Sequence, residues 1–181
     1  MKTQEIGQSG MIASRVALGV MRMDALDAAD AARTVAVAHD SGIDYFDTAE
    51  CIHRCSTLKS NSIWRAIPQP IAPVASCLIS RLKHMTIQAW CPFQSGTEYG
   101  PFVGNEHFPE LNAELTRLAG KYGSTPNGIA VAWILRHPAG IQPLLGSMTP
   151  ERIRQMAAGA DIELERRDWW SLYQAAGNPL V

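Results

Sequence analysis

The sequence predicts an α/β fold whose strands run parallel, and three observations support this class. First, an apolar strand, an amphipathic helix and a second short strand follow one another between residues 15 and 46. Strand, helix and strand within about thirty residues form a βαβ unit, in which the two strands are parallel. Second, the same alternation returns after residue 83. Third, 46% of the 181 residues are hydrophobic and 18% are charged, which suits one soluble globular domain with a core.

Residues 1–50 form the first predicted βαβ unit. Residues 15–20 (RVALGV) are apolar and include small residues near their end, as in a buried strand. Asp27 is placed to cap the following helix, whose apolar residues recur at helical spacing, and Gly42 is placed to end it in the left-handed conformation. Residues 43–46 give the second strand.

The C-terminal part, residues 83–181, begins with a predicted strand over residues 86–90 (TIQAW). Pro109 opens a helix that carries leucines on one face, and Gly123 stops it. A second helix starts at Pro126 and ends before the next proline of the chain.

A short strand over residues 142–146 (QPLLG) comes next, and Pro143 fits it only at the strand's start. Pro150 opens the following helix, which ends near Gly159, and a last helix covers about residues 165–176.

Residues 51–82 differ from both parts because they show no sustained hydrophobic period. Three prolines between positions 68 and 73 argue against a long helix there. Cys51, His53 and Cys55 have a spacing that matches no common zinc pattern, so the sequence favours incidental reduced thiols over a metal site.

Composition also bears on partners and location. The net charge is −1, the pI is about 6.5, and no basic stripe is present, so nucleic acid is not an expected partner. No apolar run approaches the ~20 residues of a membrane span. The N-terminal residues MKTQEIGQSG lack the apolar core of a signal peptide, so the cytoplasm is the expected location.

Three motifs, in chain order GIDYFDTAE, TIQAWCPFQ and QPLLGSMTPERIRQ, resemble the aldo-keto reductase family. From ISRLKHMTIQAW to AAGNPL the chain is similar to that family's bacterial subgroup of NADP-dependent oxidoreductases. The resemblance covers roughly residues 16–49 and 81–180.

The resemblance implies a (β/α)8 barrel, a fold that typically needs about 250 residues. The family places four more strands between Asp47 and Thr86, where this chain has roughly thirty-five residues and one βαβ unit already takes about thirty. The resemblance therefore implies a partial barrel with about half the strands. It is one domain, truncated internally between about residues 50 and 82, with residues 51–82 as a non-matching patch. A genomic deletion and a frameshifted segment would both give this pattern.

Members of the family reduce carbonyls with a proton from a Tyr, helped by a Lys, an Asp and usually a His. The resemblance makes Asp47 the catalytic Asp, and a polar strand-end residue or helix cap is the alternative reading. The Tyr position falls on Ile52, which has no proton to give, and the Lys and His belong to the missing strands. His53 in place of the Tyr, and Lys59 or Lys83 in place of the Lys, are less favoured.

On the cofactor side, the resemblance assigns binding roles to Trp90, Cys91, Pro92, Phe93, Ser95, Gly146, Ser147, Met148, Arg152 and Gln155. Trp90 matches the aromatic residue on which the nicotinamide ring stacks, with a core tryptophan as the alternative. Residues 91–95 match the loop along the pyrophosphate, where Cys91 replaces a common Ser. Residues 19–22 follow the first strand, where the family's chain approaches the nicotinamide, although Gly19 would equally suit the end of a strand.

Residues 146–150 lead into a helix start, where an anion is favoured. Arg152 matches the residue that grips the 2′-phosphate of NADP, and a solvent-facing arginine is the alternative. Gln155 and Met156 fall where the adenine is held, and Met156 replaces a usual Asn.

Two functions from different classes fit these observations. The first is an NADP(H)-linked oxidoreductase of this family that binds its cofactor weakly and whose carbonyl reduction is impaired or absent. The second is a non-catalytic NADP-binding or interaction module that forms a homodimer, or pairs with a full-length relative, through the unpaired edges of a half barrel. A fragment without function is the third reading. The substrate stays unspecified, because several strand ends that would carry substrate loops are absent.

Overall fold

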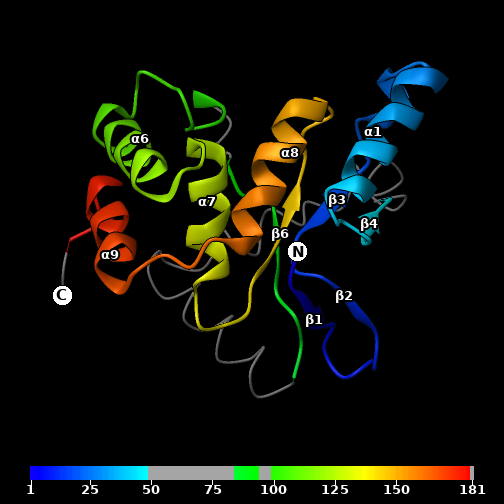
Figure 1. Ribbon diagram of the computed structural model, residues 1–181, viewed down its shortest axis with the longest axis horizontal. Helices are drawn as coiled ribbons and strands as arrows, with labels where there is room; N and C mark the ends of the chain where they lie inside the picture. Colours follow the sequence, from blue (N-terminus) through cyan, green and yellow to red (C-terminus); the bar gives the residue numbers. More distant parts are fainter. Residues whose placement is uncertain (49–83, 94–98, 180–181) are drawn as a thin grey trace, which may run out of the picture.

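A four-stranded parallel sheet lies at the centre of the described chain (Figure 1). The computed structural model describes residues 1–48, 84–93 and 99–179. The sheet is built from β3 (Ala17–Gly19), β4 (Phe46–Asp47), β5 (Gln88–Trp90) and β6 (Gln142–Leu145), in the spatial order β4-β3-β6-β5. Every neighbouring pair in it is parallel. β1 (Thr3–Glu5) and β2 (Ile12–Ser14) form a separate antiparallel hairpin.

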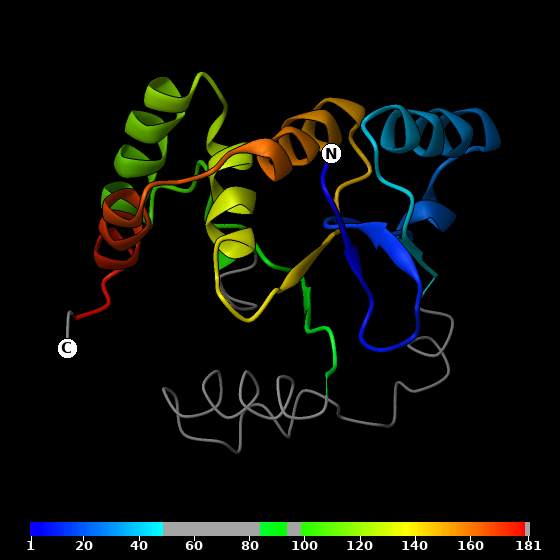
Figure 2. The same ribbon diagram turned by 60° about the horizontal axis from the view of Figure 1, so that its bottom comes forward.

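Helices lie along one side of this sheet (Figure 2). The helices α1 (Ala28–Asp40), α7 (Pro126–Leu135) and α8 (Pro150–Ala158) bury a core against it. The core consists of Val16, Leu18, Val37, Ala38, Ile43, Val131, Leu135, Leu145, Ile153, Met156, Ala157 and Ala160.

A second core lies where α6 (Pro109–Tyr122) and α9 (Arg166–Ala175) pack beside α7. Leu115, Leu118, Ile129 and Leu172 are among its buried residues. Two short 3-10 turns, η1 (Met23–Ala25) and η2 (Gly159–Asp161), complete the described elements.

Local signals end the helices where the sequence predicts. Asp27 accepts a hydrogen bond from the amide of Asp30 at 2.8 Å and so caps α1. Gly42 and Gly123 follow α1 and α6 with φ angles of +85° and +59°, a left-handed conformation that glycine adopts without strain.

The predicted βαβ unit is confirmed by the parallel pairing of β3 and β4, but the predicted strand over residues 43–46 is wrong in its bounds. Ile43 donates its amide hydrogen to the carbonyl of Ala38 at 3.0 Å and so closes the end of α1. Since this residue belongs to the helix end, β4 begins only at Phe46.

Pro143 is the second residue of β6, a central strand. The amide of Gln142 donates to the carbonyl of Ile87 at 2.9 Å, on the side of β5. On the other side, the register with β3 begins at Leu144, opposite Ala17. The Pro143 nitrogen therefore lies where the ladder does not require a donor, which agrees with the expectation that proline sits near the strand's start.

The helix α7 closely approaches α8 and the turn η2 at two glycines, Gly128 of α7 and Gly159, the first residue of η2. A Cβ added at Gly159 would overlap the carbonyl oxygen of Gly128, and one added at Gly128 would lie 3.1 Å from the carbonyl oxygen of Gln155. Both glycines have ordinary negative-φ or helical backbone rather than the left-handed kind. Gly159 therefore requires glycine, because an added Cβ would overlap backbone, whereas at Gly128 an added Cβ would crowd the Ser124 hydroxyl at 2.5 Å and the Gln155 carbonyl.

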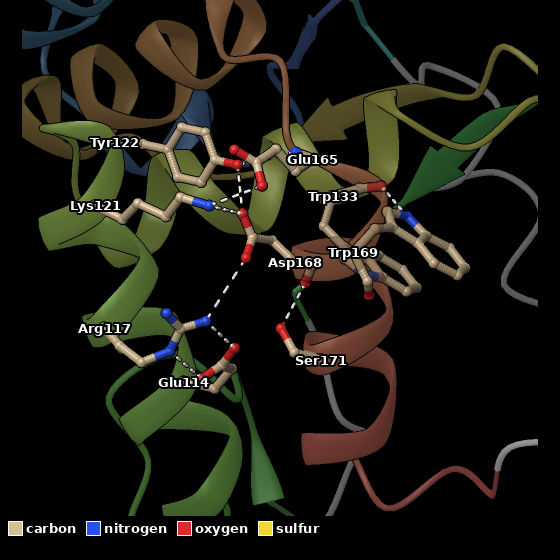
Figure 3. A network of polar contacts seen from close by, with 9 residues as sticks. All are labelled: Glu114, Arg117, Lys121, Tyr122, Trp133, Glu165, Asp168, Trp169 and Ser171. Carbon is tan, nitrogen blue, oxygen red and sulfur yellow. Dashed lines mark hydrogen bonds and ion pairs between the residues drawn. The ribbon is translucent and has the colours of Figure 1, made fainter.

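A polar network joins α6 to α9 (Figure 3). The carboxylate of Asp168, buried with 4% of its surface exposed, accepts hydrogen bonds from Lys121 Nζ at 2.7 Å and from the Tyr122 hydroxyl at 2.5 Å. Arg117 lies 3.7 Å away and is itself held by Glu114 through two bonds of 2.7 Å. Burial alone would raise the pKa of Asp168, but Lys121, Tyr122 and Arg117 outweigh it and hold the pKa below its ordinary value.

Candidate functional site

A cavity of about 780 Å³ opens at the carboxyl ends of all four parallel strands. The last residue of each strand lines it: Gly19 of β3, Asp47 of β4, Trp90 of β5 and Leu145 of β6. Proteins with parallel sheets bind their ligands at this edge, because loops from several strands converge there. Its volume lies within the roughly 300–1,000 Å³ of ligand pockets.

Asp47 lies half-buried at the end of β4. Its main-chain carbonyl accepts a hydrogen bond from the amide of Val20 at 2.9 Å, which ties it to the end of β3. Met21 and Arg22, from the segment after β3, line the same cavity. The structure thus brings the predicted catalytic Asp and the predicted nicotinamide-side segment to one wall.

Trp90 contributes an accessible indole to the cavity. It is 54% exposed, so the alternative reading of a core tryptophan does not hold. Cys91, Pro92 and Phe93 follow it along the cavity wall. Phe93 packs edge-to-face on Phe102 with ring centroids 5.7 Å apart, and its carbonyl accepts the amide of Phe102 at 3.0 Å.

Cys91 turns the chain away from β5 with a φ of 47°, which is unusual for a residue with a side chain. Burial raises the pKa of its thiol, and the nearby positive charge of Arg22 opposes this only in part. The thiol therefore stays protonated at neutral pH, so this position offers a weak S–H donor rather than a negative charge.

The segment between β6 and α8 forms a third wall, with Gly146, Ser147 and Met148 lining the cavity. Ser147 Oγ accepts a hydrogen bond from the amide of Thr149 at 3.2 Å. Arg152 lies in the first turn of α8, is exposed, and lines the cavity as well. Among the described residues no carboxylate lies within ion-pair distance of Arg152, so its guanidinium is available to an anion at this helix start.

Of the predicted residues, Gln155 is absent from the described lining of the cavity, and Ser95 lies outside the described residues. Gln155 is turned toward neighbouring side chains: its Nε2 donates to Glu151 at 3.2 Å, and its Oε1 accepts from Asn127 Nδ2 at 2.8 Å. Met156 does line the cavity, although most of its side chain is buried in the core.

Sequence reasoning missed two parts of the wall. One is the loop between β5 and α6, which contributes Pro101, Val103, Gly104, Asn105 and Glu106. In its described part, Gly100 and Gly104 have positive φ angles, a sign of a loop turning back on itself. The other is Asn127, near the start of α7.

The cavity is balanced in charge and suits a polar, extended ligand with an aromatic part. Its described lining carries the arginines Arg22 and Arg152 and the carboxylates Asp47 and Glu106.

Within the described ranges, no group of three or more His, Cys, Asp or Glu side chains could hold a metal ion. No described helix is long and apolar enough to cross a membrane. Ile52, His53, Lys59, Lys83 and the other cysteines fall outside the described residues.

Comparison with known proteins gives a family. The model of the aldo/keto reductase family matches residues 70–176, which is more than half of the chain. The chain is 34% identical over 94 residues to a 6-dehydroglucose reductase of Agrobacterium fabrum (strain C58 / ATCC 33970), covering 52% of this chain and 30% of that protein. A second 6-dehydroglucose reductase, from Novosphingobium aromaticivorans, is 29% identical over 92 residues, covering 51% and 30%. The chain thus aligns with less than a third of these relatives.

A solved structure agrees over nearly the whole chain. It is a thermostable aldo-keto reductase in complex with the inhibitor epalrestat, with a TM-score of 0.65, 12% identity, and coverage of 97% of this chain and 100% of that chain. Together with the parallel sheet, this likeness confirms the predicted α/β class and the partial barrel.

Proposed function

The chain belongs to the aldo/keto reductase family, and on that basis we propose that it binds NADP(H) in the cavity but reduces carbonyl compounds poorly. One observation carries the proposal. Asp47, Trp90 and Arg152, each assigned from a different sequence motif, line the same cavity at the carboxyl edge of the sheet. Chance placement of three unrelated surface residues would not bring them to one cavity.

In this proposal each residue meets a different part of the cofactor. The exposed face of Trp90 stacks on the nicotinamide ring, and the guanidinium of Arg152 binds the 2′-phosphate. The main chain at the start of α8 favours the negative charge of the phosphates. Bound NADPH supplies hydride equivalents to a carbonyl carbon, so the protein's remaining task is to deliver a proton to the carbonyl oxygen.

Delivery of this proton to the carbonyl oxygen is the step that this chain performs poorly. By the family resemblance, Ile52 stands at the position of the Tyr that donates the proton, and the Lys and His have no counterpart. By the same resemblance, Asp47 is the residue that pairs with that Lys. Positioned proton transfer contributes typically about 10²–10⁴-fold to rate. We therefore expect turnover to be lower by about that factor than in a family member that has the Tyr, Lys and His.

Cofactor binding and turnover are tested separately. NADPH is titrated calorimetrically into the wild-type chain, Trp90→Ala and Trp170→Ala, the last being an exposed tryptophan outside the cavity and thus the matched control. Loss of stacking costs about 1–3 kcal/mol per base in comparable sites, and only Trp90→Ala is expected to show it. Equal affinities in all three, or no binding at all, would remove the proposal.

Turnover is followed as NADPH consumption over a panel of aldehydes and quinones, together with 6-dehydroglucose because two relatives carry that name. We expect turnover lowered by about the 10²–10⁴-fold that positioned proton transfer contributes, and no further loss on Asp47→Ala. Substantial turnover that Asp47→Ala or His53→Ala abolishes would show that the catalytic half of the proposal is wrong.

A non-catalytic interaction module is the second candidate function. The open order β4-β3-β6-β5 favours it, because each end strand has one neighbour among the described strands. Such a module is expected to assemble with a second copy of itself or with a full-length relative.

A further inference from the structure

Asn127 owes its place at the cavity to the close crossing of α7 and α8. Because Gly128 and Gly159 carry no side chains, the two helices approach until a Cβ on one would overlap the backbone of the other. This contact sets Asn127, the second residue of α7, beside Gln155 of α8. Asn127 also lines the cavity, next to the wall that Met156 and Arg152 form.

A chain of hydrogen bonds fixes which way the Asn127 amide points. The carboxylate of Glu151 can only accept, so it takes the Nε2 donor of Gln155, at 3.2 Å. Gln155 therefore presents its Oε1 to Asn127, whose Nδ2 donates to it at 2.8 Å. An amide nitrogen has two hydrogens. These hydrogen bonds therefore use only one N–H of the Asn127 amide. Its Oδ1 acceptor and its second N–H donor remain available to a ligand.

We infer that Asn127 is the residue that reads the base of the nucleotide, and that it selects adenine. An asparagine amide pairs with adenine by accepting from the exocyclic N6 amine and donating to N7. Met156 is apolar and largely buried, so it offers the base a packing surface but no hydrogen bond. A base carrying a carbonyl oxygen in place of the amine would set two acceptors against each other. This inference rests on the proposed NADP(H) binding and adds a residue and a base specificity to it.

The base specificity depends on the series of hydrogen bonds that joins Glu151, Gln155 and Asn127. If Asn127 were free to rotate by half a turn, its nitrogen would serve a carbonyl base equally well. Glu151, exposed on the first turn of α8, prevents this through Gln155. Removing Glu151 should therefore relax the base preference without removing the contact.

The test compares NADPH with its hypoxanthine analogue, which differs only at the base. Both are titrated calorimetrically into the wild-type chain, Asn127→Ala, Glu151→Ala and, as matched control, Asn178→Ala, an exposed asparagine near the C-terminus and outside this cavity. The wild-type chain and the control are expected to prefer NADPH by about tenfold, within the usual range for a bidentate base contact. Asn127→Ala should bind NADPH about tenfold more weakly than the wild-type chain does, and should bind both dinucleotides equally. Glu151→Ala should lose most of the preference for NADPH over the analogue and keep its NADPH affinity within about threefold of the wild-type value.

The outcomes separate this inference from the proposed function. NADPH binding with no base preference in the wild-type chain would overturn the inference and leave NADP(H) binding intact. A preference that Asn127→Ala retains would do the same. Binding of neither dinucleotide would overturn both. Thermal unfolding of each variant shows whether it folds, and since Glu151 is exposed, Glu151→Ala tests the base preference even if Asn127→Ala does not fold.

Discussion

Among the described residues that line the proposed site, Arg152 is the side chain that we expect to distinguish the two nicotinamide cofactors. NADPH carries a 2′-phosphate that NADH lacks, and a guanidinium binds phosphate oxygens through charge-assisted hydrogen bonds. We expect Arg152→Ala to weaken NADPH binding by about 1.5–3 kcal/mol and to leave NADH binding unchanged. Calorimetric titration of both cofactors into the variant measures the difference.

Arg154→Ala is the matched control for this prediction. Arg154 is exposed on the same helix, pairs with Glu151 at 3.6 Å, and does not belong to the described lining of the cavity. Equal losses of NADPH affinity in both variants would contradict the assignment of Arg152. So would equal affinities of the unmodified chain for NADPH and NADH.

At the residue scale, the site was predictable where its residues are consecutive in the chain. Gly146, Ser147 and Arg152 follow one strand and start one helix, so their common place follows from local structure. Asn127 was not predictable, because its place depends on the spacing of two helices that meet only in the folded protein. Gln155 was expected at the cavity and instead pairs with Asn127 for the same reason.

At the scale of elements, the contact between α7 and the end of α8 leaves no room for a side chain at Gly159. Gly159→Ala would place a methyl group on the carbonyl oxygen of Gly128, so the helices must separate. Overpacking of this kind costs typically about 1–3 kcal/mol and occasionally more, and we expect the upper part of that range because the neighbour is backbone. Urea unfolding measures the loss.

Gly120→Ala is the control for this substitution. Gly120 is an exposed helical glycine in α6, and an added Cβ would meet nothing within 4 Å. Alanine is favoured over glycine in a helix by about 1 kcal/mol, so this variant should be more stable than the wild-type chain. Destabilisation of similar size in both variants would show that steric overlap at Gly159 is not the cause.

The contact between α6 and α9 should depend on pH through Asp168. Its pKa in the folded chain lies below the unfolded value of about 3.9. The ionised carboxylate therefore contributes stability that is complete above about pH 4 and is lost as the pH falls through the lowered folded value. We expect Asp168→Asn to lower the free energy of unfolding at pH 7 by about 1.5–3 kcal/mol, and the difference to shrink towards pH 2.

Tryptophan fluorescence reports on the packing of α9, the helix that carries both Asp168 and Trp169. Trp133 of α7 and Trp169 of α9 stack with centroids 4.9 Å apart, and each indole nitrogen donates to the other's carbonyl at 3.0 Å (Figure 3). Urea unfolding followed by this signal at pH 7 and pH 3 tests the prediction, with the exposed Asp40→Asn as control. A difference between wild type and Asp168→Asn that stays constant with pH would contradict it.

The elements themselves were predicted well where a single residue sets their ends. Caps such as Asp27 and left-handed glycines such as Gly123 act within one turn, so sequence alone locates them. Strand ends are different, because a strand exists only where a neighbour pairs with it. Ile43 looks like part of a strand by its apolar character, but its amide is taken by the end of α1.

At the scale of the whole molecule, four parallel strands form an open arc rather than a closed barrel in the described chain. The end strands β4 and β5 each have one described neighbour. A closed eight-stranded barrel has no edges, and its interior is filled by side chains from every strand. Ala17 and Leu144, which pair in register on neighbouring strands, belong to no part of the core under the helices although both are buried. Within the described part of the chain, the sheet thus has two edges and one face that a partner could complete.

A second copy of the chain fits this need by symmetry. Related by a two-fold axis along the barrel, β4 of one copy would lie beside β5 of the other, with all strands still parallel. We therefore predict a homodimer of about twice the 19.8 kDa chain mass. Light scattering over a dilution series measures this mass, and a hydrophobic dye reports any open apolar face, because exposed apolar patches above a few hundred Å² are unusual on monomers. A monodisperse monomer that melts cooperatively and binds no dye would defeat the prediction, because the sheet face would then be covered within a single chain.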